Sequence, residues 1–331
     1  MMATIPDSIV QAIRETSNIV LATHINPDGD ALGSLLGLAS VLEAMGKEVV
    51  RYLEEPVSHL YDFLPETQKV VNDLGSVQRF IEESGDDILA ISLDCGDMQR
   101  LGQSGPWLMK TRPFVVIDHH KGNNGFGDLT WIEPHRSSTG EMIYDLACVL
   151  GQPLSRNAAV CLYTAILTDT GSFHYESTSA HTFEVASRLL ECGVQPDKVA
   201  QSLYDNYTVG RLRLMQLVLA TLETFYQDRI ALLRVTRSML GRTGTGLEDT
   251  ENFINLARSI ATVEVAVFFK ETDNNMISVS LRAKGHCDVA RVAARFGGGG
   301  HRNAAGFRQS GLDMDRLRDR LLPLLMQELE S

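Results

Sequence analysis

The stretch Phe114-Val115-Val116-Ile117-Asp118-His119-His120 decides how the rest of the chain is interpreted. Its four apolar residues, three of them β-branched, are typical of a short strand that is buried on both faces of a sheet. One acidic residue and two histidines stand where this predicted strand ends. Ligands of open parallel sheets bind outside the carboxyl ends of the strands. The alternative is that Asp118 caps a turn and that both histidines are ordinary surface residues.

Strand and helix patterns alternate along residues 1–193. Strands are predicted at residues 18–23, 47–52, 87–92 and 114–117. Helices are predicted, from apolar residues at helical spacing, at residues 31–45, 142–150, 157–167 and 181–192. One of these helices follows Ser138-Thr139-Gly140-Glu141, the pattern of a capping box. The alternation predicts an α/β fold in which helices cover a doubly wound parallel sheet.

The pattern changes after Gly193. Residues 196–225 look helical throughout and are interpreted as part of a connector. Short strands return at residues 230–235, 263–270 and 276–282, and the turn Asp273-Asn274-Asn275 predicts that the last two form a hairpin on a mixed sheet. We therefore expect an N-terminal domain at 1–193, a helical connector at 194–225 and a smaller C-terminal α/β domain at 226–331.

The charge balance limits the kind of partner. With 30 basic and 42 acidic residues, the 331-residue chain has a net charge of −12. Binding to long DNA or RNA depends on many contacts between basic residues and phosphates, so an acidic chain is a poor candidate for it. A small anionic ligand at a local basic site remains compatible with this charge.

The cysteines and the apolar residues indicate the compartment. Five scattered cysteines include no C-x-x-C pair, which argues against a disulfide framework and against a thiolate zinc site. No run of about 18 apolar residues is present, so no membrane span is predicted. The expected location is the cytoplasm.

Four predicted element ends carry acidic residues or histidines. They are His24-x-x-x-Asp28-x-Asp30, Asp94, Asp118-His119-His120 and Asp169. Each alone has an ordinary explanation as a cap or a turn residue. Together they place carboxylates and imidazoles at one rim of the predicted sheet, and this set fits a dinuclear Mn, Mg or Co site better than a structural zinc site. Two metals about 3.5–4 Å apart can activate water and hold a phosphoryl group.

A second candidate site lies near the C-terminus, around the run Gly297-Gly298-Gly299-Gly300-His301. Six basic residues surround it against one acid, Asp288: Arg282, Lys284, Arg291, Arg295, Arg302 and Arg308. Consecutive glycine N–H groups can wrap a phosphate, although the run could also be a flexible linker. The predicted phosphate-binding residues are Arg282, Gly299, Gly300, His301 and Arg302.

These motifs, in this order, resemble the DHH phosphoesterase family. Residues 24–34 match its first motif, Asp94 stands in the second, Asp118-His119-His120 is the triplet that names the family, and residues 167–171 match the fourth. Residues 297–307 resemble the signature of the DHH-associated C-terminal domain. Within the family, the two-domain layout resembles the nanoRNase/pAp phosphatase (NrnA-type) subgroup.

The resemblance implies roles for the site residues. His24 and Asp28 would hold one divalent metal ion, Asp30, His119 and Asp169 a second, and Asp94 would bridge them. Mn(II) is the metal that the family usually uses. His120 would face the scissile phosphate as a charge stabiliser or proton donor, and Asp118 would orient a ligand imidazole through its ring N–H.

The resemblance also implies a function. The N-terminal domain would be catalytic and the C-terminal domain would bind substrate: short single-stranded RNA of about two to five nucleotides, degraded to mononucleotides, or 3′-phosphoadenosine 5′-phosphate (pAp), converted to AMP. Open alternatives are a cyclic or linear dinucleotide phosphodiesterase, an inorganic pyrophosphatase and a non-catalytic nucleotide sensor. Long duplex nucleic acid and membranes are not expected partners, and the sequence leaves monomer and homodimer open.

Overall fold

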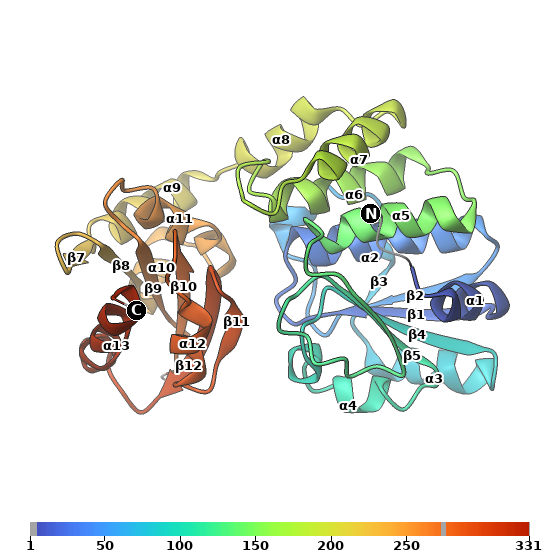
Figure 1. The fold of residues 1–331 in the computed structure, drawn as a ribbon, viewed down its shortest axis with the longest axis horizontal. Helices are drawn as coiled ribbons and strands as arrows, with labels where there is room; N and C mark the ends of the chain where they lie inside the picture. Colours follow the sequence, from blue (N-terminus) through green and yellow to red (C-terminus); the bar gives the residue numbers. More distant parts are fainter. Residues whose placement is uncertain (1–4, 273–275, 331) are drawn as a thin grey trace. The chain divides into compact units, whose positions relative to one another are not determined.

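The computed structural model describes residues 5–272 and 276–330, except for the side chain of His301. The chain divides into two compact units between Asp205 and Asn206. Each unit contains a six-stranded sheet with helices packed on it (Figure 1).

The sheet of the first unit is entirely parallel. In the strand order β3-β2-β1-β4-β5-β6, every neighbouring pair runs in the same direction. The strands are β1 (Asn18–Thr23), β2 (Glu48–Tyr52), β3 (Val70–Val71), β4 (Ile88–Leu93), β5 (Phe114–Asp118) and β6 (Leu129–Ile132). The predicted α/β fold with a parallel sheet is confirmed. The short edge strands β3 and β6 were not predicted.

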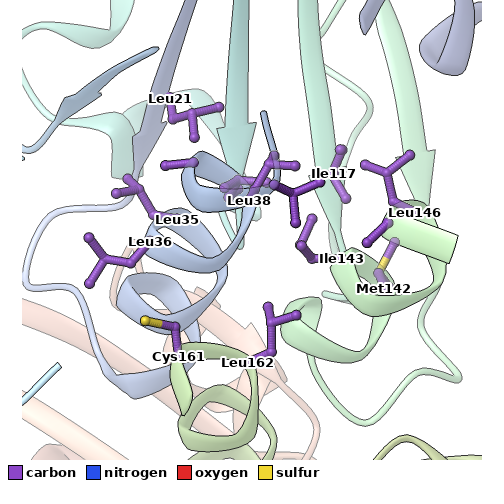
Figure 2. Close-up of a cluster of buried hydrophobic side chains, with 14 of the residues drawn as sticks. Leu21, Leu35, Leu36, Leu38, Ile117, Met142, Ile143, Leu146, Cys161 and Leu162 are labelled. Carbon is purple, nitrogen blue, oxygen red and sulfur yellow. The ribbon is translucent and has the colours of Figure 1, made fainter. Parts of the chain in front are cut away.

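Both faces of this sheet are covered, which explains why its central strands are apolar along their whole length. Ile19 and Leu21 of β1 belong to the larger hydrophobic cluster on one face, whereas Val20 and Ala22 belong to the cluster on the other face. The helices that contribute to the larger cluster are α1 (Asp7–Glu15), α2 (Gly29–Ala44), α5 (Thr139–Leu150), α6 (Arg156–Asp169), α7 (Ala180–Glu191) and α8 (Pro196–Tyr204). Figure 2 shows side chains of α2, α5 and α6 in this cluster. The opposite face is covered by α3 (Leu74–Ser84), η3 (Met98–Leu101) and α4 (Gly105–Leu108).

Helices α2 and α6 pack unusually closely because glycines line their contact. Gly29, Gly33 and Gly37 recur at every fourth position of α2 and face α6. A Cβ atom at Gly33 would lie only 2.4 Å from the carbonyl oxygen of Cys161. The close approach brings the start of α2 next to the end of α6, where Asp169 lies.

The predicted connector contains a break that its sequence pattern did not indicate. Residues 196–225 form α8 (Pro196–Tyr204) in the first unit, then α9 (Val209–Leu219) and β7 (Glu223–Phe225) in the second. The expectation of continuous helix was therefore wrong at residues 205–208 and 220–225. Thr208 starts α9 by accepting a hydrogen bond from the backbone N–H of Arg211, so its side chain takes over the first helical hydrogen bond.

The sheet of the second unit is mixed, as predicted. Its order is β11-β12-β10-β9-β8-β7, with β8 and β9 parallel and the other pairs antiparallel. The strands are β8 (Ile230–Val235), β9 (Val265–Glu271), β10 (Met276–Ala283), β11 (Gly299–His301) and β12 (Ala304–Ser310). The predicted turn at residues 273–275 lies outside the described residues.

The helices of the second unit lie on both faces of its sheet. Besides α9 they are α10 (Arg237–Thr243), α11 (Phe253–Arg258), α12 (Val289–Ala294) and α13 (Met314–Leu329). Short 3-10 turns complete the chain at η1 (His59–Tyr61), η2 (Thr67–Lys69) and η4 (Glu248–Thr250). Among the helices described here, none combines the length and the apolar character that crossing a bilayer requires.

Candidate metal centre

The candidate centre lies where the strand order of the first sheet changes direction. From β1 the chain builds the sheet outward through β2 and β3, and then returns to place β4 on the other side of β1. Such a switch point leaves a crevice at the carboxyl ends of the strands. His24 follows β1, Asp94 follows β4, and His119 follows β5. The parallel sheet therefore collects side chains that are far apart in sequence.

A first group consists of His24, Asp28 and Asp94, whose candidate ligand atoms all lie within 4.8 Å of one another. Nδ1 of His24 is 2.9 Å from the carbonyl oxygen of Ile25, a group that can only accept a hydrogen bond. Nε2 is buried, has no hydrogen-bond partner among the described residues and lies 3.6 Å from Oδ2 of Asp94. A ring nitrogen in this position, next to a carboxylate, fits a ligand of a bound cation.

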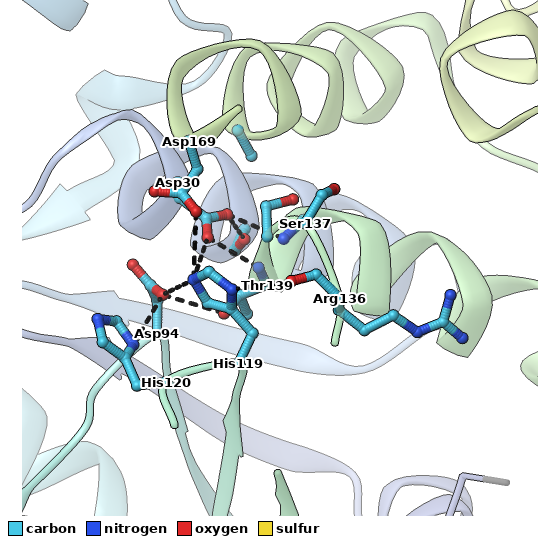
Figure 3. Close-up of polar contacts among 12 residues, drawn as sticks. Asp30, Asp94, His119, His120, Arg136, Ser137, Thr139 and Asp169 are labelled. Atoms are coloured by element: carbon cyan, nitrogen blue, oxygen red, sulfur yellow. Dashed lines mark hydrogen bonds and ion pairs between the residues drawn. The ribbon is translucent and has the colours of Figure 1, made fainter. Parts of the chain in front are cut away.

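A second group consists of Asp30, His119 and Asp169. Nε2 of His119 lies 3.6 Å from Oδ2 of Asp30 and 3.3 Å from Oδ2 of Asp169 (Figure 3). The same nitrogen is 3.6 Å from Oδ1 of Asp94, which therefore reaches both groups. The fold thus brings together all six residues that the sequence analysis suggested as metal ligands.

Asp30 is held by the start of a helix rather than by a basic side chain. Its carboxylate accepts hydrogen bonds from the backbone N–H groups of Thr139 (2.7 Å) and Gly140 (2.9 Å), in the first turn of α5, and from the Ser34 hydroxyl (3.0 Å). A helix N-terminus stabilises a nearby negative charge. The Thr139 hydroxyl also donates to Oδ1 of Asp94 (3.1 Å). One residue of α5 therefore orients two of the candidate ligands.

The carboxylates are crowded together. Burial raises the pKa of Asp30 well above its usual value, and neighbouring carboxylates raise it further. Burial also raises the pKa of Asp169, to about 6, although the charge of His119 opposes this. For Asp94, burial acts to raise the pKa, but contacts with the surrounding imidazoles outweigh it and hold the pKa below its usual range. Buried like charges of this kind are stabilised by divalent cations, which fit this donor set.

His120 has different neighbours from His119. Nδ1 of His120 lies 2.6 Å from the buried Asp118 carboxylate, and Nε2 lies 3.4 Å from Nη1 of Arg100. Burial acts to lower the pKa of His120, but the hydrogen bond to Asp118 and the charge of Asp94 raise it to about 9. The structure thus places a basic imidazole and a guanidinium side by side at the edge of the acidic cluster.

The Asp118 carboxylate contacts one of the two adjacent imidazoles. It lies against His120, which with Asp94 and His119 forms a third group of candidate ligand atoms, whereas Nδ1 of His119 lies 3.2 Å from the carbonyl oxygen of Arg136. Asn123 also donates to Asp118, at 2.6 Å. A backbone carbonyl therefore fixes the tautomer of the candidate ligand His119.

Comparison with known proteins identifies the family. A match to the DHH family, N-terminal domain, covers residues 18–166, and a match to the DHHA1 domain covers residues 233–327. A Thermus thermophilus protein, "Bifunctional oligoribonuclease and PAP phosphatase NrnA", is 32% identical over 312 residues, which cover 94% of this chain and 90% of the relative. The chain belongs to the DHH/DHHA1 phosphoesterase family.

Further relatives support this assignment. A Bacillus subtilis protein of the same name is 27% identical and covers 90% of this DHH phosphoesterase and 91% of its own length. The crystal structure of an exopolyphosphatase-related protein from Bacteroides fragilis is 30% identical, covers 97% of both chains and superposes with a TM-score of 0.88. The chain is therefore a hydrolase, and its His/Asp groups are candidate sites for the divalent metals of the family.

The predicted capping box of the DHH phosphoesterase is only half formed. Ser138 accepts a hydrogen bond from the backbone N–H of Glu141 (3.1 Å), as predicted. The buried Glu141 carboxylate instead accepts hydrogen bonds from Arg136 (2.9 Å), Ser137 and Thr182 (2.8 Å). Glu141 therefore holds Arg136 in place, and the carbonyl oxygen of Arg136 is the one that contacts Nδ1 of His119. No local sequence pattern reveals this role.

In the DHHA1 unit the second half of the glycine run, Gly299 and Gly300, lies in a strand. Gly299–His301 form β11 and pair with β12. A Cβ atom at Gly298 would lie 2.2 Å from the carbonyl oxygen of Gly306, and Gly300 has a φ of +138°. The close pairing of β11 with β12 thus explains, without any ligand, why glycine is needed at positions 298 and 300. The side chain of His301 lies outside the described residues.

Several basic side chains of the DHHA1 unit bind groups of the protein. Arg302 donates to the carbonyl oxygen of His286 (2.8 Å), and Lys284 to that of Ile260 (2.7 Å). Arg291 pairs with Asp288 (3.5 Å) and with a second acid. Arg282, near the end of β10, donates to the carbonyl oxygen of Leu281 (3.1 Å). The excess of basic residues seen in the sequence is therefore partly structural.

Proposed function

We propose that this DHH phosphoesterase degrades oligoribonucleotides of about two to five nucleotides to mononucleotides and converts pAp to AMP. The observation that carries the proposal is the pair of His/Asp groups that share Asp94. It is supported by the similarity to NrnA proteins along about nine tenths of both chains.

We assign the metal ligands by group. His24, Asp28 and Asp94 hold one divalent cation, and Asp30, His119 and Asp169 hold the other, with Asp94 shared between them. Mn(II) is the proposed metal. When bound, such a pair of cations neutralises phosphoryl oxygens and lowers the pKa of a water molecule. Nε2 of His24 supports this assignment because it is a buried ring nitrogen without a hydrogen-bond partner among the described residues.

The basic side chains at the edge of the cluster contact the reacting phosphate in this proposal. Asp118 holds the His120 ring through Nδ1, and in this proposal Nε2 faces a phosphoryl or leaving oxygen. Arg100 adjoins that nitrogen and makes no ion pair with a carboxylate of the described residues. Its charge is thus available to an anionic substrate. Sequence reasoning missed Arg100, because a lone arginine in a 3-10 turn has no distinguishing pattern.

Substrate selection is assigned to the DHHA1 unit. RNA ends and pAp share a terminal phosphate, and we propose that Arg282, Gly299, Gly300, His301 and Arg302 recognise it. Arg302 and Arg282 each donate to a backbone carbonyl, at 2.8 Å and 3.1 Å, and each guanidinium has five N–H donors in all. Recognition of one end is compatible with a net charge of −12, because it does not require contacts along a long phosphate backbone.

A product assay tests the function. Purified protein with Mn(II) is given 5′-phosphorylated RNA of two to five nucleotides, pAp, cyclic di-AMP and pyrophosphate in separate reactions. Asp94→Asn is the inactive variant, and Asp86→Asn, exposed just before β4, is the matched control. We expect mononucleotides and AMP from the wild type and Asp86→Asn, and neither from Asp94→Asn. Hydrolysis of pyrophosphate alone, of cyclic di-AMP alone, or of nothing by metal-loaded protein would each contradict the proposal.

A further inference from the structure

A row of paired residues crosses three strands of the second sheet. Lys270 of β9 and Arg308 of β12 are the direct cross-strand partners of Ser278 of β10, one on each side. Neighbouring strands lie about 4.7–4.9 Å apart, and directly paired residues project from the same face. The two basic residues therefore flank Ser278 on one face of the sheet.

This face differs from the face that packs on α12 and α13, and only its β9 part, with Ala266 and Phe268, is buried in the cluster formed with α9 and α11. Val279 and Leu281 of β10, Phe269 of β9 and Phe307 of β12 are buried in the cluster formed with α12 and α13. Because side chains alternate along a strand, the residues between them project from the opposite face. On β10 and β12 that face carries mostly small residues, namely Ser278, Ser280, Ala304 and Gly306. The basic side chains thus border a row of small residues on β10 and β12.

The face is positively charged. Along β9, β10 and β12 it carries Lys270, Arg282 and Arg308 and no acidic residue. Neither Lys270 nor Arg308 forms a salt bridge within the described residues, and Arg308 is exposed. Burial lowers the pKa of Lys270, the charge of Arg282 lowers it further, and Glu251 opposes them, so these groups lie within electrostatic reach of one another.

We propose that Lys270, Ser278 and Arg308 form a second phosphate-binding position, which takes an internal phosphodiester of a short single-stranded RNA. The inference rests on the proposed function and adds a length preference to it. Ser278 and Arg282 are four residues apart on β10, a rise of roughly 13 Å. An oligonucleotide occupies both positions, whereas a single bisphosphorylated nucleoside occupies only the one at Arg282.

Steady-state kinetics of two substrates test the proposal. The full chain with Mn(II) is assayed with pAp and with a 5′-phosphorylated trinucleotide as wild type, Arg308→Gln and the double variant Lys270→Gln/Arg308→Gln. We expect the ratio of kcat/KM for trinucleotide over pAp to fall roughly tenfold in the double variant, since charge-assisted contacts are lost. The change should lie in KM, and the plot of log KM against log salt should become shallower by about 1.4, for two contacts.

The controls separate binding from folding. Arg316→Gln removes the same charge from an exposed position on α13 and should leave the ratio unchanged. Arg308→Lys keeps a positive charge and should retain most of the wild-type ratio of kcat/KM for trinucleotide over pAp. Because Arg308 is exposed, Arg308→Gln should fold normally and show part of the loss. An unchanged ratio, or an equal loss for both substrates, overturns the second position but leaves the proposed function intact. Failure of the wild type on both substrates overturns the function itself.

Discussion

Asp94 adopts a left-handed backbone conformation, with a φ of +53°, directly after β4. Side chains other than glycine rarely adopt this region, although Asp and Asn tolerate it better than most because they hydrogen-bond locally. Such strain persists where the surrounding structure fixes it, and it is concentrated at functional sites. The conformation directs the carboxylate of Asp94 toward His24 and His119 together.

This conformation leads to a prediction for two variants of one residue. Asp94→Asn and Asp94→Ala both remove a carboxylate that both groups share, so both should abolish hydrolysis. Their stabilities should differ, because alanine tolerates the left-handed region less well than asparagine. We expect the free energy of unfolding of metal-free Asp94→Ala to be about 1 kcal/mol lower than that of Asp94→Asn. Urea denaturation in EDTA measures the difference in the free energy of unfolding. Equal midpoints would show that the left-handed conformation at position 94 costs the same with alanine as with asparagine.

At the scale of secondary-structure elements, the glycine-lined contact between α2 and α6 sets the geometry of the centre. Asp28 and Asp30 stand at the start of α2, and Asp169 ends α6. The distance between these carboxylates therefore depends on how closely the helices pack. An added methyl group at the contact must displace one helix, since interiors are densely packed.

Gly33→Ala should therefore be harmful, although alanine is the better helix former. The new Cβ atom would meet a backbone oxygen at 2.4 Å and the Cβ atom of Ala165 at 2.9 Å. We expect a loss of about 1–3 kcal/mol in stability and weaker Mn(II) binding, measured by urea denaturation and calorimetry. Gly241→Ala is the matched control: nothing lies within 4 Å of its Cβ position in α10. It should gain about 0.5–1 kcal/mol. Similar effects of both variants would refute the packing argument.

The elements that the sequence predicted are those with a strong local pattern. The apolar runs of β1, β4 and β5 were recognised because both faces are buried. Edge strands such as β3 and β11 were missed, since two or three residues carry no periodicity. The continuous helix expected at 196–225 failed because α8 ends at the polar segment 205–208, where Thr208 caps the start of a new helix.

The site was predictable to the extent that its residues stand in motifs. The six candidate ligands were found because each ends an element in a recognisable pattern. The residues that orient them were not, because their partners are distant in sequence. Thr139, for example, meets Asp30 and Asp94 only after the sheet has formed. The capping motif at residues 138–141 accounted for Thr139 as part of a helix start, so nothing in the sequence indicated its contacts with Asp30 and Asp94.

At the scale of the whole molecule, all the candidate ligands belong to the first unit, and each unit has its own hydrophobic clusters. A bound metal stabilises only the states that present its ligands, by about 2.7 kcal/mol when its concentration is 100 times Kd. The effect of the metal on local stability should therefore be uneven along the chain.

Hydrogen exchange followed by mass spectrometry tests this expectation. Adding Mn(II) to EDTA-treated protein should slow exchange in β1, β4, β5 and α6, because these elements carry the ligands. Strands β9 and β10 of the second unit should exchange as before. Asp94→Asn should show no response, whereas Asp86→Asn should behave as the wild type. Equal protection of β9 and β10 in the wild type would show that metal binding acts on the chain as one cooperative body.

The wide sequence separation of His24, Asp94 and Asp169 has a consequence for kinetics. A chain that has not yet ordered its sheet cannot present these residues together, because each strand must first pair with its neighbours. Metal ions would then have little influence on the speed of refolding and would act chiefly by slowing unfolding. The metal centre would form late in folding. Bound metal would therefore lengthen the time for which the native state persists, whereas the fold itself would form without it.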